Sequence, residues 1–373
     1  MVNLKSFKSL REFTGYNDIT ILCHNYPDAD TIASGFALYS YFKANSKANL
    51  RLIYGGTSKI TKTNLKLLVN LLEIPIEHVT EPFKVKGLLI TVDCQYSSGN
   101  VLNLNAQDVL ILDHHRMCQE LKTLEENSSS NIYASIRDNL GSCSSLVYHY
   151  LIKDNFKPNI KVSTALYYGL YMDTYDFSEI REVIDMNMRD NLSIDSSLFT
   201  LLRNSNVTKD ELILAGNALS KVNVHKSFAY IQSEECDPNI LGLIADMLIM
   251  VEKVSVAVVF SKLSTPLLTH NASFKFSVRT CVNEIGAHDF AEKMVSPIID
   301  GETIGFGGGH KHKAGGTIDA ECFEKWCKAN NKKNDFGEYL KECFDEYPTP
   351  CDYWSIDSFI IDKNTGDVSI KKS

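Results

Sequence analysis

The sequence predicts an α/β protein with a parallel sheet in its N-terminal part. Between residues 18 and 173, short runs of aliphatic and β-branched residues alternate with helical stretches. This alternation is typical of βαβ units, whose strands are parallel. The 373-residue length also exceeds the size at which a single core usually stops growing. We therefore expect a parallel-sheet domain followed by a second α/β domain.

The expected elements of the first domain follow in chain order. The strands are four apolar runs: Ile19–Cys23, Leu50–Tyr54, Leu88–Val92 and Val109–Leu112. The helices are three stretches of helical periodicity: Ala33–Phe42, Ser142–Leu151 and Ser163–Tyr171. Gly55-Gly56 supplies a turn signal after the second strand.

The second domain begins after a change in composition. A charged stretch rich in Asn and Ser runs to about Ser205, and the helical pattern Lys209–Val222 follows it. We interpret residues 1–185 as the first domain, 186–224 as a linker with a helix, and 225–373 as the second domain. In this last part we expect strands Val254–Phe260 and Phe274–Thr280, a helix Ala287–Val295, and a final hairpin around residues 364–367.

Composition narrows the classes of function. The net charge of -8 argues against a basic groove for long duplex DNA, so any nucleic-acid ligand should be small. No apolar run approaches the roughly 20 residues of a membrane span, and Met1–Leu10 lacks a secretory signal. We expect a cytoplasmic protein with no membrane partner, whose ten cysteines are reduced. Those near the C-terminus form no C-x-x-C pair, which favours buried thiols over zinc: Cys322, Cys327, Cys343 and Cys351.

Potential metal ligands follow the first expected strand. His24, Asp28 and Asp30 fall within seven residues, where a parallel strand passes into a loop. Ligands of open α/β sheets bind at the carboxyl ends of strands, so the position suits a site. In an extended loop the two carboxylates could point the same way. The alternative is that Asp30 caps the following helix.

Further acids end other elements of the same domain. Asp93 follows the third expected strand, Asp113 follows the fourth, and Asp173 follows a helix. Carboxylates that meet at one sheet edge repel one another unless cations are present. His114 and His115 add imidazoles and no cysteine joins the set, which favours Mn²⁺, with Co²⁺, Fe²⁺ or Mg²⁺ as alternatives.

This ordered set resembles the DHH phosphoesterase family through about Ala320. The resemblance implies two divalent metal ions that activate a bridging water, and a smaller mixed-sheet C-terminal domain with the active site in the cleft between the domains. By position, the resemblance implies that His24 and Asp28 bind one metal, that Asp30, His114 and Asp173 bind the other, and that Asp93 bridges both. It also implies that His115 faces the phosphate and that Asp113 orients a histidine.

A second motif lies in the C-terminal part. The run Gly307-Gly308-Gly309-His310 is followed by Ala314-Gly315-Gly316. Glycines let backbone N–H groups approach an anion, although a flexible turn is the simpler interpretation. The resemblance implies a GGGH-type motif of the associated domain, in which Gly308, Gly309 and His310 bind substrate.

The same resemblance extends to an arginine on an expected strand. It implies that Arg279 clamps a phosphate, whereas a surface ion pair on an edge strand is the alternative. Asp246 also resembles a family helix start, and a helix cap explains it equally well. Together with His115, Arg279 and His310 would neutralise charge that develops on the phosphate oxygens.

The substrate is the least determined part of the prediction. The resemblance is to the oligoribonuclease and nucleotide bisphosphate phosphatase-like branch, which implies hydrolysis of short oligoribonucleotides or linear dinucleotides to mononucleotides. The alternatives are a phosphatase on nucleotide 3',5'-bisphosphate, a cyclic-dinucleotide phosphodiesterase and an exopolyphosphatase. Every expected ligand position is filled, which disfavours a non-catalytic nucleotide-binding regulator. A homodimer is compatible with the resemblance. Aromatic residues near Asp173 could stack on a base or pack between helices: Tyr171, Tyr175 and Phe177.

Overall fold

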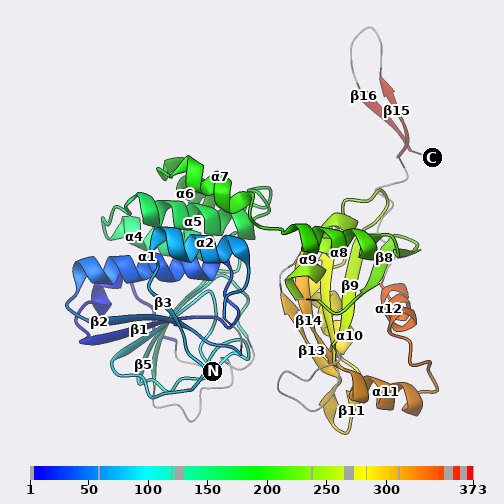
Figure 1. The fold of residues 1–373 in the computed structure, drawn as a ribbon, viewed down its shortest axis with the longest axis horizontal. Coiled ribbons are helices and arrows are strands. Elements are labelled where there is room, and N and C mark those ends of the chain that lie inside the picture. Colours follow the sequence, from blue (N-terminus) through cyan, green and yellow to red (C-terminus); the bar gives the residue numbers. More distant parts are fainter. Residues whose placement is uncertain are drawn as a thin grey trace. The chain divides into compact units, whose positions relative to one another are not determined.

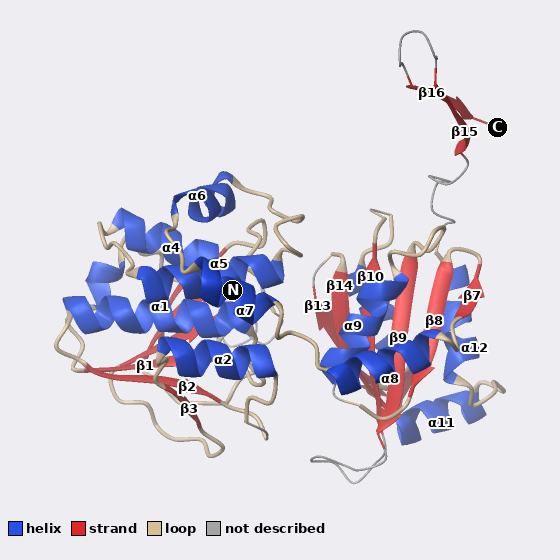
Figure 2. Cartoon of the chain, turned by 45° about the horizontal axis from the view of Figure 1, so that its top comes forward, coloured by secondary structure: helices blue, strands red, loops and turns tan. Residues whose placement is uncertain are grey.

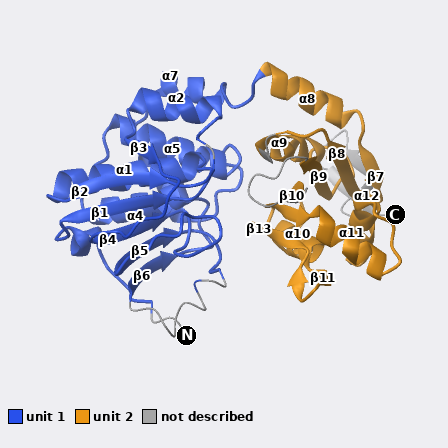
Figure 3. Cartoon of the chain, turned by 60° about the horizontal axis from the view of Figure 1, so that its bottom comes forward, with its two compact units in different colours: residues 1–208 blue, residues 209–373 orange. Residues whose placement is uncertain are grey.

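The structure is a computed structural model in which two compact units are distinguished. The described residues are 4–57, 59–118, 121, 130–236, 238–263, 273–282, 284–309, 311–347, 356–361 and 368–372. The first unit comprises residues 1–208 and the second residues 209–373 (Figure 3). The boundary between them falls inside the segment 186–224 that we interpreted as a linker.

A parallel sheet forms the centre of the first unit. Its strands are β1 (Asp18–Cys23), β2 (Asn49–Tyr54), β3 (Ile76–His78), β4 (Leu88–Val92), β5 (Asp108–Asp113) and β6 (Asn131–Ile136). They lie in the order β3-β2-β1-β4-β5-β6, and each neighbouring pair is parallel. The predicted α/β class and parallel sheet are therefore confirmed. The two outermost strands were not predicted, because β3 is short and β6 is half-exposed and partly polar.

The helices of the first unit lie over one face of this sheet (Figure 1). They are α1 (Ala29–Asn45), α2 (Thr63–Leu72), α4 (Cys143–Lys153) and α5 (Ile160–Asp173), with α6 (Val183–Asn191) packed on α4 and α7 (Ser196–Arg203) packed on α2. Alternate residues of β1 divide between the two faces, as strand geometry requires. Ile19 and Ile21 join the core under the helices, whereas Leu22 joins an opposite core covered by residues 94–106.

Close packing of α5 against α1 and α4 depends on Gly169. A Cβ atom at this position would lie 2.4 Å from Ser144 Oγ, 3.1 Å from Asp30 Oδ1 and 3.2 Å from Ala33 Cβ. These separations are too short for non-bonded atoms, so any side chain here would push the helices apart. The glycine thus sets the approach of the helices that carry Asp30 and Asp173.

Gly169→Ala should destabilise the protein although alanine favours helices. We expect the free energy of unfolding to fall by about 1–2 kcal/mol, because the buried clash outweighs the gain of about 1 kcal/mol in helix propensity. Gly216→Ala in α8 (Lys209–Leu219) is the matched control, since no described atom comes within 4 Å of its added Cβ. This control should stabilise by about 0.5–1 kcal/mol. Urea unfolding followed by circular dichroism measures both, and equal stabilisation by the two substitutions would contradict the packing argument.

A mixed sheet forms the centre of the second unit (Figure 2). Its strands are β7 (Asn223–His225), β8 (Phe228–Ser233), β9 (Val256–Leu263), β10 (Ser273–Thr280), β13 (Gly305–Gly309) and β14 (Lys313–Asp319). They lie in the order β13-β14-β10-β9-β8-β7. β8 and β9 pair in parallel, and the other neighbouring pairs are antiparallel. The smaller α/β domain with a mixed sheet is confirmed.

Helices cover both faces of the mixed sheet. α8 and α9 (Pro238–Leu248) pack on one face, and α10 (Ala287–Val295), α11 (Ala320–Ala329) and α12 (Phe336–Asp345) pack on the other. Two small antiparallel pairs complete the unit: β11 (Ile298–Ile299) with β12 (Glu302–Thr303), and β15 (Ile356–Ile361) with β16 (Val368–Lys372). The hairpin turn expected at residues 364–367 lies outside the described residues.

The glycine run of the second unit is a strand. Gly307 pairs with Gly316 and Gly308 pairs with Gly315, in the antiparallel register of β13 and β14. The interpretation of this run as a flexible turn is therefore wrong. Helix packing explains one of the glycines, because a Cβ at Gly307 would lie 2.7 Å from the carbonyl oxygen of Ala291 in α10.

Candidate metal centre

The loop after β1 ends in a helix cap supplied by Asp28. Its Oδ1 accepts hydrogen bonds from the backbone N–H groups of Asp30 at 3.0 Å and Thr31 at 3.1 Å. Its extended backbone, with φ -98° and ψ -169°, is that of an N-cap residue. The cap is thus Asp28 and not Asp30, which lies buried inside the first turn of α1. The two carboxylates consequently leave the chain at different points and reach different partners.

Asp28 joins the first of three overlapping groups of possible metal ligands. His24 directs Nε2 toward two carboxylates, at 3.7 Å from Asp28 Oδ1 and 3.6 Å from Asp93 Oδ2. The other ring nitrogen of His24 lies 2.9 Å from the carbonyl oxygen of Asn25. A backbone carbonyl on Nδ1 favours the tautomer that leaves Nε2 available to a metal ion. One nitrogen and two carboxylates lie close enough together to hold a cation.

Asp30 joins the second group. His114 Nε2 lies 3.1 Å from Asp173 Oδ2 and 3.9 Å from Asp30 Oδ2. Its Nδ1 faces the carbonyl oxygen of Leu140 at 3.3 Å, so this imidazole is oriented in the same manner as His24. The three residues come from α1, the end of β5 and the last position of α5.

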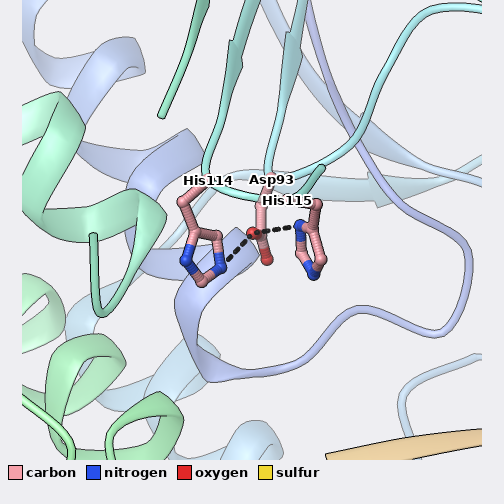
Figure 4. Close-up of side chains that lie close together, drawn as sticks. All are labelled: Asp93, His114 and His115. Atoms are coloured by element: carbon pink, nitrogen blue, oxygen red, sulfur yellow. Dashed lines mark ion pairs between the residues drawn. The ribbon is translucent and has the colours of Figure 1, made fainter. Parts of the chain in front are cut away.

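Asp93 lies between the two groups. Its Oδ2 faces His24, and its Oδ1 lies 3.3 Å from Nε2 of His114 (Figure 4). The residue is 3% exposed, and among the described residues no group donates a hydrogen bond to Oδ1. A buried carboxylate oxygen without a donor is costly unless a cation compensates it. The donor set of carboxylates and imidazoles therefore fits divalent metal ions, as the sequence predicts.

The backbone holds Asp93 in an uncommon conformation. Its φ of +59° is left-handed, and its N–H donates to the carbonyl oxygen of Leu112 at 2.9 Å. Asp and Asn tolerate this region better than most residues do. The turn directs the carboxylate at the end of β4 toward the ligands that follow β1 and β5.

The N-terminus of α4 fixes Asp30. Its two carboxylate oxygens accept the backbone N–H groups of Cys143 at 2.6 Å and Ser144 at 2.9 Å. Exposed N–H groups at a helix start stabilise a negative charge. We did not predict this contact from the sequence, although Ser142 signals the helix start and caps it.

Electrostatics in the site reflect its crowded carboxylates. Burial, and then the neighbouring Asp93 and Asp173, raise the pKa of Asp30 well above its usual value. Burial lowers the pKa of His24 and His114, but the acids beside each histidine outweigh it and raise both pKa values. The imidazoles are therefore surrounded by an excess of negative charge. Bound metal ions would supply the compensating positive charge, since metal ligands are deprotonated.

His115 forms a third candidate group with Asp93 and His114, and Asp113 holds its imidazole. Its Nδ1 lies 2.8 Å from Asp113 Oδ1 and 3.7 Å from Asp93 Oδ1 (Figure 4). Asp113 also accepts the backbone N–H of His114, and its Oδ2 accepts the side chain of Gln95 at 2.7 Å. Burial raises the pKa of Asp113, but His115, His114 and Gln95 hold it below its usual range. Asp113 therefore orients His115, whose side chain is 37% exposed.

The thiols near the site are not among these ligand groups. Cys23 Sγ donates to the carbonyl oxygen of Thr31, Cys94 Sγ to that of Val92, and Cys143 Sγ to that of Leu112. Burial raises the pKa of the Cys23 thiol to about 12. A thiol that stays protonated and points at a carbonyl is a poor metal ligand.

The site residues expected in the second unit are only partly described. Arg279 is 12% exposed on β10, where Nε donates to Asp246 Oδ1 at 2.5 Å and Nη1 to Ser277 Oγ at 2.8 Å. β10 is paired on both sides, so the edge-strand interpretation is wrong. Asp246 lies near the end of α9, so it is not a helix cap. Gly308 and Gly309 lie on β13, and His310 lies outside the described residues.

Within the described residues, no helix is both long and apolar enough to cross a membrane.

Comparison with known families matches both units. The model of the DHH family N-terminal domain matches residues 18–170, and that of the DHHA1 domain matches residues 225–342. Two curated relatives come from Methanocaldococcus jannaschii. Uncharacterized protein MJ1633 is 25% identical over 65% of this chain and 49% of its own length, so the match spans about half of that relative. Uncharacterized protein MJ0988 is 22% identical over 91% of this chain and 96% of its own length.

Among solved structures, an exopolyphosphatase-related protein from Bacteroides fragilis has a similar fold. The TM-score is 0.60 at 15% sequence identity, and the match covers 89% of this chain and 95% of that one. Both family domains occur in the order that the sequence motifs predict. The candidate ligands from His24 to His115 lie within the residues that the first model matches, and Asp173 follows them by three residues. The chain therefore belongs to the DHH phosphoesterase family and is a metal-dependent phosphoester hydrolase.

Proposed function

We propose that the protein is a Mn²⁺-dependent phosphodiesterase that hydrolyses short oligoribonucleotides or linear dinucleotides to mononucleotides. The observation that carries the hydrolytic part is Asp93, a buried carboxylate that faces both ligand groups. A carboxylate placed in this way can be shared by two cations. The choice of Mn²⁺ rests on the donor set, which combines carboxylates and imidazoles and lacks thiolate.

We assign the proposed ligands to two cations. His24 and Asp28 hold one cation, Asp93 is shared, and the other cation is held by Asp30, His114 and Asp173. When bound, two such ions would lower the pKa of water and stabilise negative charge on the phosphate. The chain contributes preorganisation, since Leu140 and Asn25 orient the imidazoles and the N-terminus of α4 holds Asp30.

Other side chains would act on the phosphate directly. Burial lowers the pKa of His115 and Asp113 raises it, with a net rise, so this imidazole can carry positive charge beside the ligand groups. We propose that it binds a non-bridging phosphate oxygen in that form. In the second unit we propose that Arg279, Gly308, Gly309 and His310 contribute to substrate binding, as the family resemblance implies.

Charge supports the preference for a short substrate. The net charge of -8 opposes the binding of a long polyanion, whose affinity depends on many basic contacts. A dinucleotide needs only a few phosphate contacts, which a small number of groups such as His115 can provide.

A substrate panel tests the proposal. The full-length protein with Mn²⁺ is incubated with a 5'-phosphorylated dinucleotide, a longer single-stranded RNA, a nucleoside 3',5'-bisphosphate, a cyclic dinucleotide and inorganic polyphosphate. Mononucleotide and free phosphate are quantified separately. We expect the dinucleotide to give the highest kcat/KM, and chelation of the metal should stop the reaction.

The alternatives predict different products in the same panel. Faster phosphate release from the bisphosphate or from polyphosphate would replace the proposed activity with a phosphatase or an exopolyphosphatase. Preferential opening of the cyclic dinucleotide would indicate a cyclic-dinucleotide phosphodiesterase. Absence of mononucleotide from the linear dinucleotide would disprove the proposal.

A further inference from the structure

An exposed tyrosine stands in the loop that carries the first ligands. Tyr26 lies between His24 and Asp28, and it is 57% exposed. Its φ of +56° places it in the left-handed backbone region. In the same loop Pro27 is buried, so the tyrosine is the side chain presented to solvent while its neighbour anchors the chain.

Folding stability does not explain a tyrosine at this position. A bulky residue in the left-handed region costs on the order of 1 kcal/mol, and Gly or Asn would adopt the same turn more readily. Burial of the ring would offset that cost, but more than half of Tyr26 remains exposed. Strained, exposed side chains next to a site commonly serve ligand binding.

The ring is nevertheless held in a defined place. Its hydroxyl shares a hydrogen bond of 2.6 Å with Thr57 Oγ1. Ring atoms Cε1 and Cζ lie 3.6 Å from the position that a Cβ of Gly56 would occupy, so the ring borders the turn that ends β2. Because β1 and β2 are parallel neighbours, this turn lies at the same sheet edge as the ligand loop.

The loop below the ring is also fixed. The backbone N–H of Asn25 donates to the carbonyl oxygen of Asn100 at 2.7 Å. The Asn25 side chain fills the place of a Cβ at Gly55, with Oδ1 2.3 Å from that position. The loop therefore rests directly on the Gly55-Gly56 turn, and the ring is supported without being covered.

Two other aromatic residues near Asp173, Tyr171 and Phe177, pack against neighbouring rings. Tyr171 lies 5.0 Å from Phe199 and 5.4 Å from Phe177 between ring centroids, in edge-to-face contacts that join α5 to α7. Tyr171 is also buried. Phe177 contacts Tyr167 and Tyr171, which both lie on α5, and the ring of Tyr26 is more accessible than that of Tyr171.

We propose that Tyr26 stacks on a nucleobase of the substrate and gives the site its preference for nucleotides over base-free phosphates. This inference rests on the proposed function and names the part of the substrate that this loop recognises. Tyr26 stands between the proposed ligands His24 and Asp28, and in a dinucleotide each base is joined through one sugar to the phosphodiester that these ligands would hold. Stacking accepts any base, because every base offers a π face.

Steady-state kinetics of Tyr26→Ala, Tyr26→Leu and Tyr26→Phe test the proposal. The substrates are a 5'-phosphorylated dinucleotide and the same molecule with its bases removed. We expect Tyr26→Ala to raise KM for the dinucleotide by about 5- to 100-fold with little change in kcat. KM for the base-free substrate should stay at the wild-type value. Tyr26→Phe keeps the ring and should stay near wild type, whereas Tyr26→Leu should resemble Tyr26→Ala.

A binding measurement separates this inference from the proposed function. A 2-aminopurine nucleoside 5'-monophosphate is titrated with the Mn²⁺-loaded protein, and stacking on the ring should quench its fluorescence with wild type and Tyr26→Phe but not with Tyr26→Ala. If the wild-type protein does not cleave the dinucleotide, the proposed function fails. The stacking role of Tyr26 is then judged only by whether Tyr26→Ala loses the fluorescence quenching that wild type shows. Equal quenching by all variants, or equal KM changes for both substrates, would overturn the stacking role.

Discussion

Asp93→Asn is expected to abolish activity while leaving the fold intact. The amide removes the negative charge that faces both ligand groups, so the protein should lose metal and kcat should fall by about 1000-fold or more. Asn matches Asp in shape and tolerates the left-handed φ of +59°. The metal-free thermal midpoint should therefore change by only a few degrees.

Metal content by mass spectrometry and thermal unfolding with and without Mn²⁺ check this result. Mn²⁺ should raise the midpoint of wild type through preferential binding to the folded state, but not that of Asp93→Asn. Asp190→Asn, which changes an exposed carboxylate paired with Arg189 on α6, is the matched control and should behave as wild type. Wild-type metal content and turnover in Asp93→Asn would refute the assignment of a shared ligand.

Asp113→Asn is expected to lower kcat by about 10- to 100-fold, because His115 loses the carboxylate that orients it. An amide has one acceptor, whereas Asp113 accepts from His115 and His114 on Oδ1 and from Gln95 on Oδ2. Whichever way the asparagine amide is turned, its NH₂ group faces a hydrogen-bond donor, either those of His114 and His115 or that of Gln95. The buried mismatch should lower the free energy of unfolding by about 1–3 kcal/mol.

A second buried carboxylate distinguishes orientation of His115 from simple destabilisation. Asp185 is fully buried and accepts backbone N–H groups, including that of Gly141 at 2.9 Å, but no imidazole. Asp185→Asn should reduce stability to a similar degree in urea unfolding and leave kcat near the wild-type value. If both substitutions lowered kcat equally, loss of stability would account for the effect of Asp113→Asn.

The ends of strands were the most predictable part of the site. Apolar runs identify β1, β4 and β5, and parallel strands carry their carboxyl ends to one edge, so the acids that follow them meet. Asp93 and Asp113 were placed by this logic alone. The division of His24, Asp28, Asp30 and the other proposed ligands between two cations came from the family resemblance and stays a prediction, although the structure brings these side chains together in overlapping groups.

Contacts that depend on packing between distant segments could not be predicted. Asp30 is held by N–H groups more than 110 residues away, and this contact requires α4 to meet α1. Gln95 reaches Asp113 only because the segment after β4 folds back beside β5. Which aspartate caps α1 depends on the backbone angles of the loop. The spacing of Asp28 and Asp30 in the sequence does not determine those angles.

The spread of the ligands along the chain has a consequence for biosynthesis. The first proposed ligand is His24, and the last, Asp173, ends α5. Chains emerge from the ribosome N-terminus first, so the nascent protein displays five of the six ligands before it displays the sixth. The complete centre can form only after α5 has left the exit tunnel and packed on α1. With the proposed ligand set, metal incorporation would be a late step in the maturation of the first unit, and a chain truncated before residue 173 would lack one of the proposed ligands.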